Sequence, residues 1–325
     1  MGAIKEKNSG IPELKINHSK QQVIKIALAG NPNSGKTTVF NILTGLNQKI
    51  GNFPDVTIDK KTGKCILPNG REVEIIDLPG TYSLHPKSLD EIVTQEVICD
   101  PANNSYPDIT VIVIDASNLK RNLFLATQVI DLKRPCLLVL NMMDLADQQK
   151  ATIDVLLLSK RLGVGVIPMN ARENKGLNEL LEALSQNITV PVASIVDVRS
   201  ISSDTIEEIK TITPAKGDYE AFQIACNYKN LPFVFQNKEV TDKLCAILEK
   251  NSFNSESAQT RETILRYKAI SEILQDCLKQ SKEPPKETFT SKLDKILTHR
   301  IWGIAVFRRM LDSDRDVIAH TPWML

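Results

Sequence analysis

The chain has 325 residues, which is long enough for two domains with cores of their own. Its 40 lysines and arginines nearly balance 39 aspartates and glutamates, so no overall positive field indicates a nucleic-acid partner. No run reaches the ~18 apolar residues of a membrane helix, and we expect the chain itself to be soluble. Residues 1–22 are a polar, lysine-rich leader without the apolar segment of a signal peptide.

The next segment reads as strand, glycine-rich loop and helix. An apolar strand over 23–29 precedes GNPNSGKTT (30–38), and a helical pattern continues to about Leu43. This order and spacing are those of a phosphate-binding loop, in which glycines let backbone N–H groups approach a phosphate. Lys36 would supply positive charge for the β- and γ-phosphates, and the Thr37 hydroxyl can ligate Mg²⁺. The predicted nucleotide-binding residues here are Gly30, Asn33, Ser34, Gly35, Lys36, Thr37 and Thr38.

Residues 47–61 are polar and irregular, and we expect a mobile loop. A threonine in such a loop commonly closes over Mg²⁺ and the γ-phosphate. Its position favours Thr57, with Thr62 or an ordinary solvated loop residue as the alternatives.

A hairpin over 63–67 and 72–76 follows, and its second strand ends in Asp77-Leu-Pro-Gly80. This D-x-x-G pattern, about forty residues after a phosphate loop, indicates the second phosphate element of GTPases. Asp77 would hold Mg²⁺ through water, and the Gly80 N–H would reach the γ-phosphate.

Buried strands then alternate with helical patterns, which predicts a mostly parallel sheet with helices on both faces, an α/β fold. The expected strands are 109–114, 136–140 and 165–168. The expected helices are 88–99, 120–132, 151–162 and 177–186.

The motif Asn141-Met-Met-Asp144 after the strand 136–140 indicates which base is bound. The Asp144 carboxylate can accept hydrogen bonds from N1–H and the N2 amino group of guanine, whereas adenine offers neither donor there. Sites built on such bonds discriminate by roughly 10⁴ or more, because an unsatisfied buried charge is costly. Met142 would supply apolar surface beside the base, and a backbone N–H after the last strand would meet guanine O6. The residues expected at that last place are Asn170, Ala171 and Arg172.

The alternation stops after residue 187, which we take as the end of a GTP-binding domain over 23–187. We expect a linker over 188–217 with a short helix at 204–210, then an all-α domain over 218–282. Its predicted helices are 219–228, 239–250 and a long amphipathic one marked by Ile264, Tyr267, Ile270, Leu274 and Cys277. Residues 291–307 look helical again. The six cysteines lack metal-ligand spacing and indicate reduced thiols.

Together these motifs resemble the FeoB family, the bacterial ferrous-iron transporters. The resemblance rests on GNPNSGKTT (30–38), NQKIGNFPDVT (47–57), DLPGTYSL (77–84) and NMMD (141–144). It covers 23–186 strongly and extends weakly to the helical stretch, which resembles the family's guanine-nucleotide-dissociation-inhibitor-like (GDI-like) domain. Residues 291–303 are similar to the family's lead-in to its first membrane helix. The family usually has Trp and Gly where this chain has Phe53 and Asp55.

The resemblance implies a Ras-like P-loop GTPase that binds GTP, GDP and Mg²⁺ and regulates iron transport. Its partner would be the membrane portion of the full-length protein, at the cytoplasmic face of the bacterial inner membrane, with a homo-oligomer as an option. It also implies a potassium ion held by Asn33, helped by carbonyls near Gly51 and Phe53. From the residues alone, Asn33 could equally be a loop-shaping side chain.

After Phe307 the family should continue into a membrane helix, but residues 308–316 are too charged to span. We expect residues 283–325 to be a lead-in to the membrane region with an atypical tail. Either the chain is a truncated or cut cytoplasmic portion, or its last eighteen or so residues are foreign to it.

Two other interpretations stay open at this point: a soluble GTPase of ribosome assembly or tRNA modification, and a binding switch whose hydrolysis is incidental. We expect slow turnover, because Thr81 stands where Ras-like GTPases have a water-orienting glutamine. Neither Arg71 nor Arg121 is obviously placed to act as an arginine finger. The predicted catalytic residues are therefore Lys36, Asn33, Thr57 and Gly80.

Overall fold

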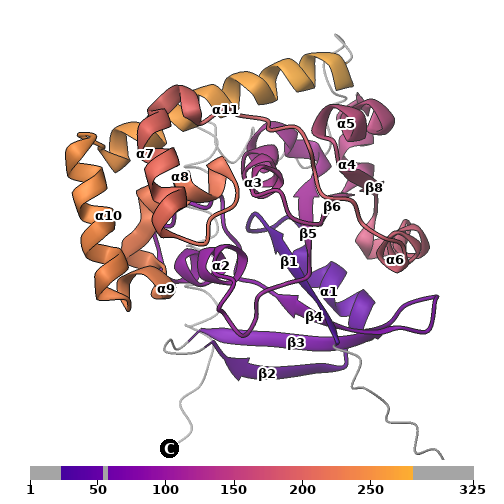
Figure 1. Ribbon diagram of the computed structural model, residues 1–325. Coiled ribbons are helices and arrows are strands. Elements are labelled where there is room, and N and C mark those ends of the chain that lie inside the picture. The colour runs from indigo at the N-terminus through magenta and orange to yellow at the C-terminus, as the bar shows by residue number, and fades with distance from the viewer. Residues whose placement is uncertain (1–22, 54–57, 281–325) are drawn as a thin grey trace, which may run out of the picture.

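The computed structural model describes residues 23–53 and 58–280 (Figure 1). A seven-stranded sheet has the order β2-β3-β4-β1-β5-β6-β8. The strands β4, β1, β5, β6 and β8 run parallel, and the hairpin strands β2 and β3 join antiparallel at one edge. This confirms the predicted α/β fold with a mostly parallel sheet. The bounds are β1 Ile24–Gly30, β2 Gln48–Asn52, β3 Asp59–Ile66, β4 Glu72–Asp77, β5 Ile109–Asp115, β6 Cys136–Asn141 and β8 Gly165–Pro168.

Helices cover both faces of this sheet, and β1 shows how the sequence divides between them. Because successive strand residues point to opposite faces, Ile26 and Leu28 enter one hydrophobic core while Ala27 and Ala29 enter the other. The first core is closed by α1 Lys36–Thr44 and α6 Leu177–Ser185. The second is closed by α2 Leu89–Cys99, α3 Leu119–Asp131 and α5 Val155–Leu162.

The C-terminal described residues form a helical unit on the second core (Figure 1). Its longest helix, α11, crosses the top of the molecule in that view and contacts α3, α5 and α8. Buried residues of this unit, among them Phe222 and Ile270, belong to the same core as the sheet residue Ile112. The helices are α7 Arg199–Ile212, α8 Asp218–Asn227, α9 Pro232–Phe235, α10 Lys238–Lys250 and α11 Ser255–Cys277.

Several local predictions were wrong. Part of the expected loop 47–61 is strand β2, which pairs with β3, and β3 itself begins at Asp59. The expected helix 151–162 begins only at Val155, because Ala151–Ile153 is strand β7, paired with β9 Leu278–Gln280. The helix expected at 204–210 is longer than predicted, because α7 runs over Arg199–Ile212. The short helix α4 Met143–Gln148 was not predicted.

The predictions for the leader, for Asp55 and Thr57, for the helix 291–307 and for the charged tail concern residues outside the described part. Within 23–53 and 58–280, no helix combines the length and the apolar composition that crossing a bilayer requires. The division into domains at 187 and 217 stays a prediction.

Candidate nucleotide-binding site

The sequence motifs gather at one edge of the sheet. Gly30 ends β1, Asp77 ends β4, Asn141 ends β6, and Asn170 follows β8 closely. These strands are parallel, so their carboxyl ends share an edge, which is where open α/β sheets bind ligands.

The phosphate loop connects β1 to α1 through two residues of positive φ, Asn33 (65°) and Gly35 (85°). Gly35 is required sterically as well, because a Cβ there would lie 2.2 Å from Asn141 Nδ2. Ser34 is buried, and its hydroxyl has no hydrogen-bond partner within the described chain. Buried polar atoms are nearly always paired, so this orphan and the N-terminus of α1 fit an anion in the loop.

Three predicted ligands of phosphate and metal, Lys36, Thr37 and Asp77, converge beside the loop. The Lys36 ammonium donates to Asp77 Oδ1, and the Thr37 hydroxyl lies 3.3 Å from Asp77 Oδ2. Lys36 and Asp77 are only 8% and 6% exposed. Hydroxyl and carboxylate oxygens are the ligands Mg²⁺ prefers, so this donor set fits the predicted ion.

The D-x-x-G segment lies directly on the phosphate loop. A Cβ on Gly80 would stand 3.1 Å from the backbone nitrogen of Pro32, and the Thr81 N–H donates to the Gly30 carbonyl at 3.1 Å. Thr81 is fully buried, and its hydroxyl donates to the Ser83 carbonyl at 2.8 Å. That hydroxyl is therefore already committed within its own turn.

A pocket of about 260 Å³ lies beside the loop, at the carboxyl ends of β6 and β8. Asn141 holds its walls together: its Nδ2 donates to the Ser34 carbonyl at 2.9 Å, and its Oδ1 accepts from the Ala171 N–H at 3.0 Å. Asp144 is half-buried at the same pocket. The lining brings together nine predicted site residues, namely Asn33, Gly35, Thr38, Asn141, Met142, Asp144, Asn170, Ala171 and Arg172.

The predicted site residues therefore gather in two adjoining places. The structure brings Gly30, Ser34, Lys36, Thr37, Asp77 and Gly80 to the phosphate loop and the other nine to the adjoining pocket. Only Thr57 lies outside the described residues. No group of three or more His, Cys, Asp or Glu side chains in the described part is arranged to hold a metal ion.

Comparison with known proteins agrees with this site. Residues 24–184 match the family model described as ferrous iron transport protein B. The cytosolic domain of L. pneumophila FeoB is 32% identical, with a TM-score of 0.65, over 79% of this chain and all of that one. The chain belongs to the FeoB family. A GDP-bound mutant of the S. thermophilus FeoB G-domain aligns over the same shares, at 32% identity and a TM-score of 0.62.

The Fe(2+) transporter FeoB of Salmonella typhimurium is 31% identical over 303 residues, and that of Legionella pneumophila (strain Paris) is 34% identical over 293. Each alignment covers 87% of this chain. The chain spans about 37% of the length of these relatives. The likeness confirms the P-loop GTPase fold and does not favour the ribosome-assembly alternative.

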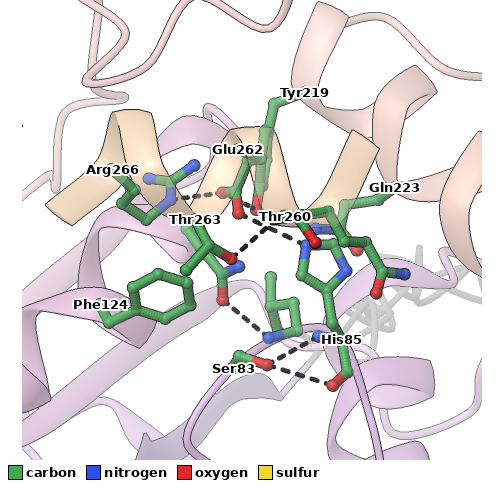
Figure 2. A network of polar contacts seen from close by, with 12 residues as sticks. Ser83, His85, Phe124, Tyr219, Gln223, Thr260, Glu262, Thr263 and Arg266 are labelled. Atoms are coloured by element: carbon green, nitrogen blue, oxygen red, sulfur yellow. Dashed lines mark hydrogen bonds and ion pairs between the residues drawn. The ribbon is translucent and has the colours of Figure 1, made fainter. Parts of the chain in front are cut away.

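Sequence reasoning missed a buried charged network that joins this FeoB G-domain to its helical unit (Figure 2). His85, just after the D-x-x-G segment, places Nε2 3.6 Å from Glu262 on α11. Glu262 accepts from Arg266 Nε at 2.5 Å, and Arg266 Nη1 donates to Asp131 on α3 at 2.9 Å. The i, i+4 spacing of Glu262 and Arg266 was the available signal, but such pairs usually lie on solvent-exposed faces.

Hydrogen bonds fix the backbone on both sides of the network. Next to His85, two neutral glutamines hold Leu84, which donates its N–H to Gln128 at 2.8 Å and accepts from Gln95 at 3.1 Å. Asp131 accepts from the N–H groups of Ile195 and Val196. The segment after D-x-x-G and the chain entering α7 are thus tied to the same cluster of charges.

Proposed function

We propose that this chain is the GTP-binding and GTP-hydrolysing module of a ferrous-iron transporter. The observation that carries the proposal is the pocket in which Asp144 and Asn141 adjoin the phosphate loop. A phosphate loop alone would fit any nucleotide, whereas a half-buried carboxylate beside it selects a base with two donors on one edge. Guanine has that edge and adenine does not.

Within this proposal the base contacts divide among three motifs. Asp144 accepts from guanine N1–H and N2–H, and Met142 covers the base with its thioether. The loop over Asn170–Arg172 presents a backbone N–H to O6. Asn141 holds that loop and the phosphate loop at a fixed spacing through its two hydrogen bonds.

For the phosphates, Lys36 and backbone N–H groups of the phosphate loop neutralise charge, and Gly80 meets the γ-phosphate. Mg²⁺, when bound, would offset the charge of the β- and γ-phosphates, and Thr37, Thr57 and Asp77 would hold it. The Lys36–Asp77 pair keeps both charged groups beside the loop. GDP binding by the S. thermophilus relative supports the nucleotide assignment.

We further propose slow hydrolysis that potassium accelerates. The Thr81 hydroxyl bonds within its own turn and does not replace a water-orienting glutamine. A potassium ion held by Asn33 would supply positive charge between the phosphates, where an arginine finger acts in other GTPases. Unassisted turnover should be near the intrinsic Ras rate of ~10⁻⁴–10⁻³ s⁻¹.

Iron transport itself belongs in this proposal to a membrane portion of the full-length protein, which this module regulates from the cytoplasmic face of the inner membrane. The relatives are Fe(2+) transporters, and the chain spans about 37% of their length. Among the residues described here no metal-binding cluster exists that would carry iron specificity. A homo-oligomer fits the same proposal, and the near-zero net charge gives no support for a nucleic-acid partner.

Single-turnover hydrolysis of GTP in equal concentrations of KCl and NaCl tests the catalytic part. Potassium should raise the rate at least about tenfold, roughly 1.4 kcal/mol of barrier. Asn33→Ala should remove that difference while GTP still binds, and Asn69→Ala, in the distant β3–β4 turn, should keep it. Equal rates in the two salts, or a potassium effect that survives Asn33→Ala, would contradict the potassium site. No hydrolysis above buffer in either salt would contradict the GTPase itself.

A further inference from the structure

The N-terminus of α3 contacts both phosphate elements, through a residue that the mechanism above does not use. The Arg121 guanidinium carbon lies 4.2 Å from the centroid of the Tyr82 ring. Tyr82 is the second residue after Gly80. The backbone carbonyl of the same arginine accepts from Asn31 Nδ2 at 3.5 Å, within the phosphate loop. One residue of α3 therefore contacts the phosphate loop with its main chain and the D-x-x-G segment with its side chain.

The backbone between these two contacts has little freedom. Gly80 abuts Pro32, and Thr81 donates to Gly30 and is fully buried. Tyr82 then turns outward, and the residue is 38% exposed. The stack on Arg121 is thus one side-chain contact at the point where the segment leaves the phosphate loop for solvent, and the other is Glu91 Oε1, which accepts from the Tyr82 N–H at 3.5 Å.

Asn31 supports the idea that this junction is built rather than incidental. It is 3% exposed, and its Oδ1 has no hydrogen-bond partner within the described chain. Because this buried amide donates a hydrogen bond to the Arg121 carbonyl, it fixes the start of α3 relative to the loop.

We propose that Arg121 is a positioning residue for GTP hydrolysis, and that its cation–π stack on Tyr82 holds Gly80 where its N–H meets the γ-phosphate. The inference rests on the proposed GTPase function. Losing the stack would let the segment leave the loop more often, and the rate would fall with the fraction of molecules still in position. An exposed cation–π contact corresponds to a roughly two- to fivefold change in such an equilibrium.

A double-mutant cycle on the full chain separates this role from a general effect of charge. Single-turnover hydrolysis at saturating GTP should fall in Arg121→Ala, by up to about fivefold, whereas GDP affinity should change less than twofold. Lys120→Ala removes a neighbouring exposed charge without touching Tyr82 and should leave the rate unchanged. Arg121→Ala should still lower the rate in a Tyr82→Phe background, which keeps the ring face, but not in a Tyr82→Leu background.

The decisive outcome is the Tyr82 dependence. If Arg121→Ala leaves the hydrolysis rate unchanged or raises it, or lowers it equally in the Tyr82→Leu background, the positioning role is wrong. If the unmutated chain neither binds nor hydrolyses GTP, the proposed function fails instead. The two failures are therefore distinguishable in one set of measurements.

Discussion

Lys36 and Asp77 show how single residues at this site serve both ligand and fold. Both lie almost wholly inside the protein, and each is the charged partner of the other. Removing one member of such a pair leaves an uncompensated buried charge, which costs about 3–5 kcal/mol. Thr37 differs, because it is exposed and contributes only a 3.3 Å contact to the same carboxylate.

We therefore predict different consequences for two loop substitutions. Thr37→Ala should abolish Mg²⁺-dependent GTP turnover and leave the urea unfolding midpoint of the nucleotide-free chain unchanged. Lys36→Ala should abolish turnover too, and should also lower the free energy of unfolding by about 3 kcal/mol, because the buried Asp77 carboxylate loses its partner. Turnover assays and urea titrations measure both effects. Normal turnover by Thr37→Ala would require another phosphate site.

At this scale the motif spacing indicated which residues gather at the candidate site. Asn141 and Asp144 were recognisable from a four-residue motif that follows a predicted buried strand. The partners of Asn141, Ser34 and Ala171, are 107 and 30 residues away, and only the folded sheet brings them together. Arg121 was set aside for the same reason, since its contact with Tyr82 depends on how α3 packs.

Helix α11 shows the corresponding limit for whole elements. Its existence was predicted from apolar residues at steps of three and four, but two of those, Ile264 and Tyr267, are 64% and 36% exposed. The face that is buried there carries Glu262 and Arg266 instead. Hydrophobic periodicity cannot identify a buried face made of paired charges. Strand β7 was missed differently, because its partner β9 lies far along the chain.

The charges of α11 predict a particular acid sensitivity. Burial disfavours the Glu262 carboxylate, but Arg266 and His85 outweigh it and lower the pKa of Glu262 to about 2. A pKa below the unfolded value of 4.5 stabilises the folded chain above pH 4.5, and this stability is lost as the pH falls towards 2. Burial raises the pKa of Asp131 despite Arg266, so Asp131 opposes this trend.

We expect Glu262→Gln to lower the free energy of unfolding at pH 7 by on the order of 3 kcal/mol and to flatten its decline between pH 4.5 and 3. Urea unfolding at a series of pH values measures both. Glu239→Gln on α10 removes an exposed i, i+4 partner of Lys243 and should follow the unmutated curve. A Glu262→Gln curve parallel to the unmutated one would contradict the assigned pKa.

At the scale of the whole molecule, the sheet and the helical unit share one hydrophobic core. The sheet brings four motifs to one edge, and the second core continues without a break from the sheet into α8 and α11. The segment after D-x-x-G leaves that edge and ends at His85, in contact with Glu262 of the helical unit (Figure 2). This segment therefore connects the phosphate edge of the sheet to the helical unit through the buried side chain of His85.

The proposed selectivity for guanine nucleotides is tested most directly by measuring the nucleotide affinity of the full chain. Equilibrium titration should give GTP an affinity roughly 10⁴-fold or more above ATP. Asp144→Ala should cost several kcal/mol in GTP affinity, through loss of a charged bidentate pair. Asp144→Asn should lower the affinity for GTP and raise the affinity for xanthosine triphosphate, because the xanthine base carries a carbonyl where guanine has the amino group. Equal affinity of the unmutated chain for ATP and GTP would contradict the account.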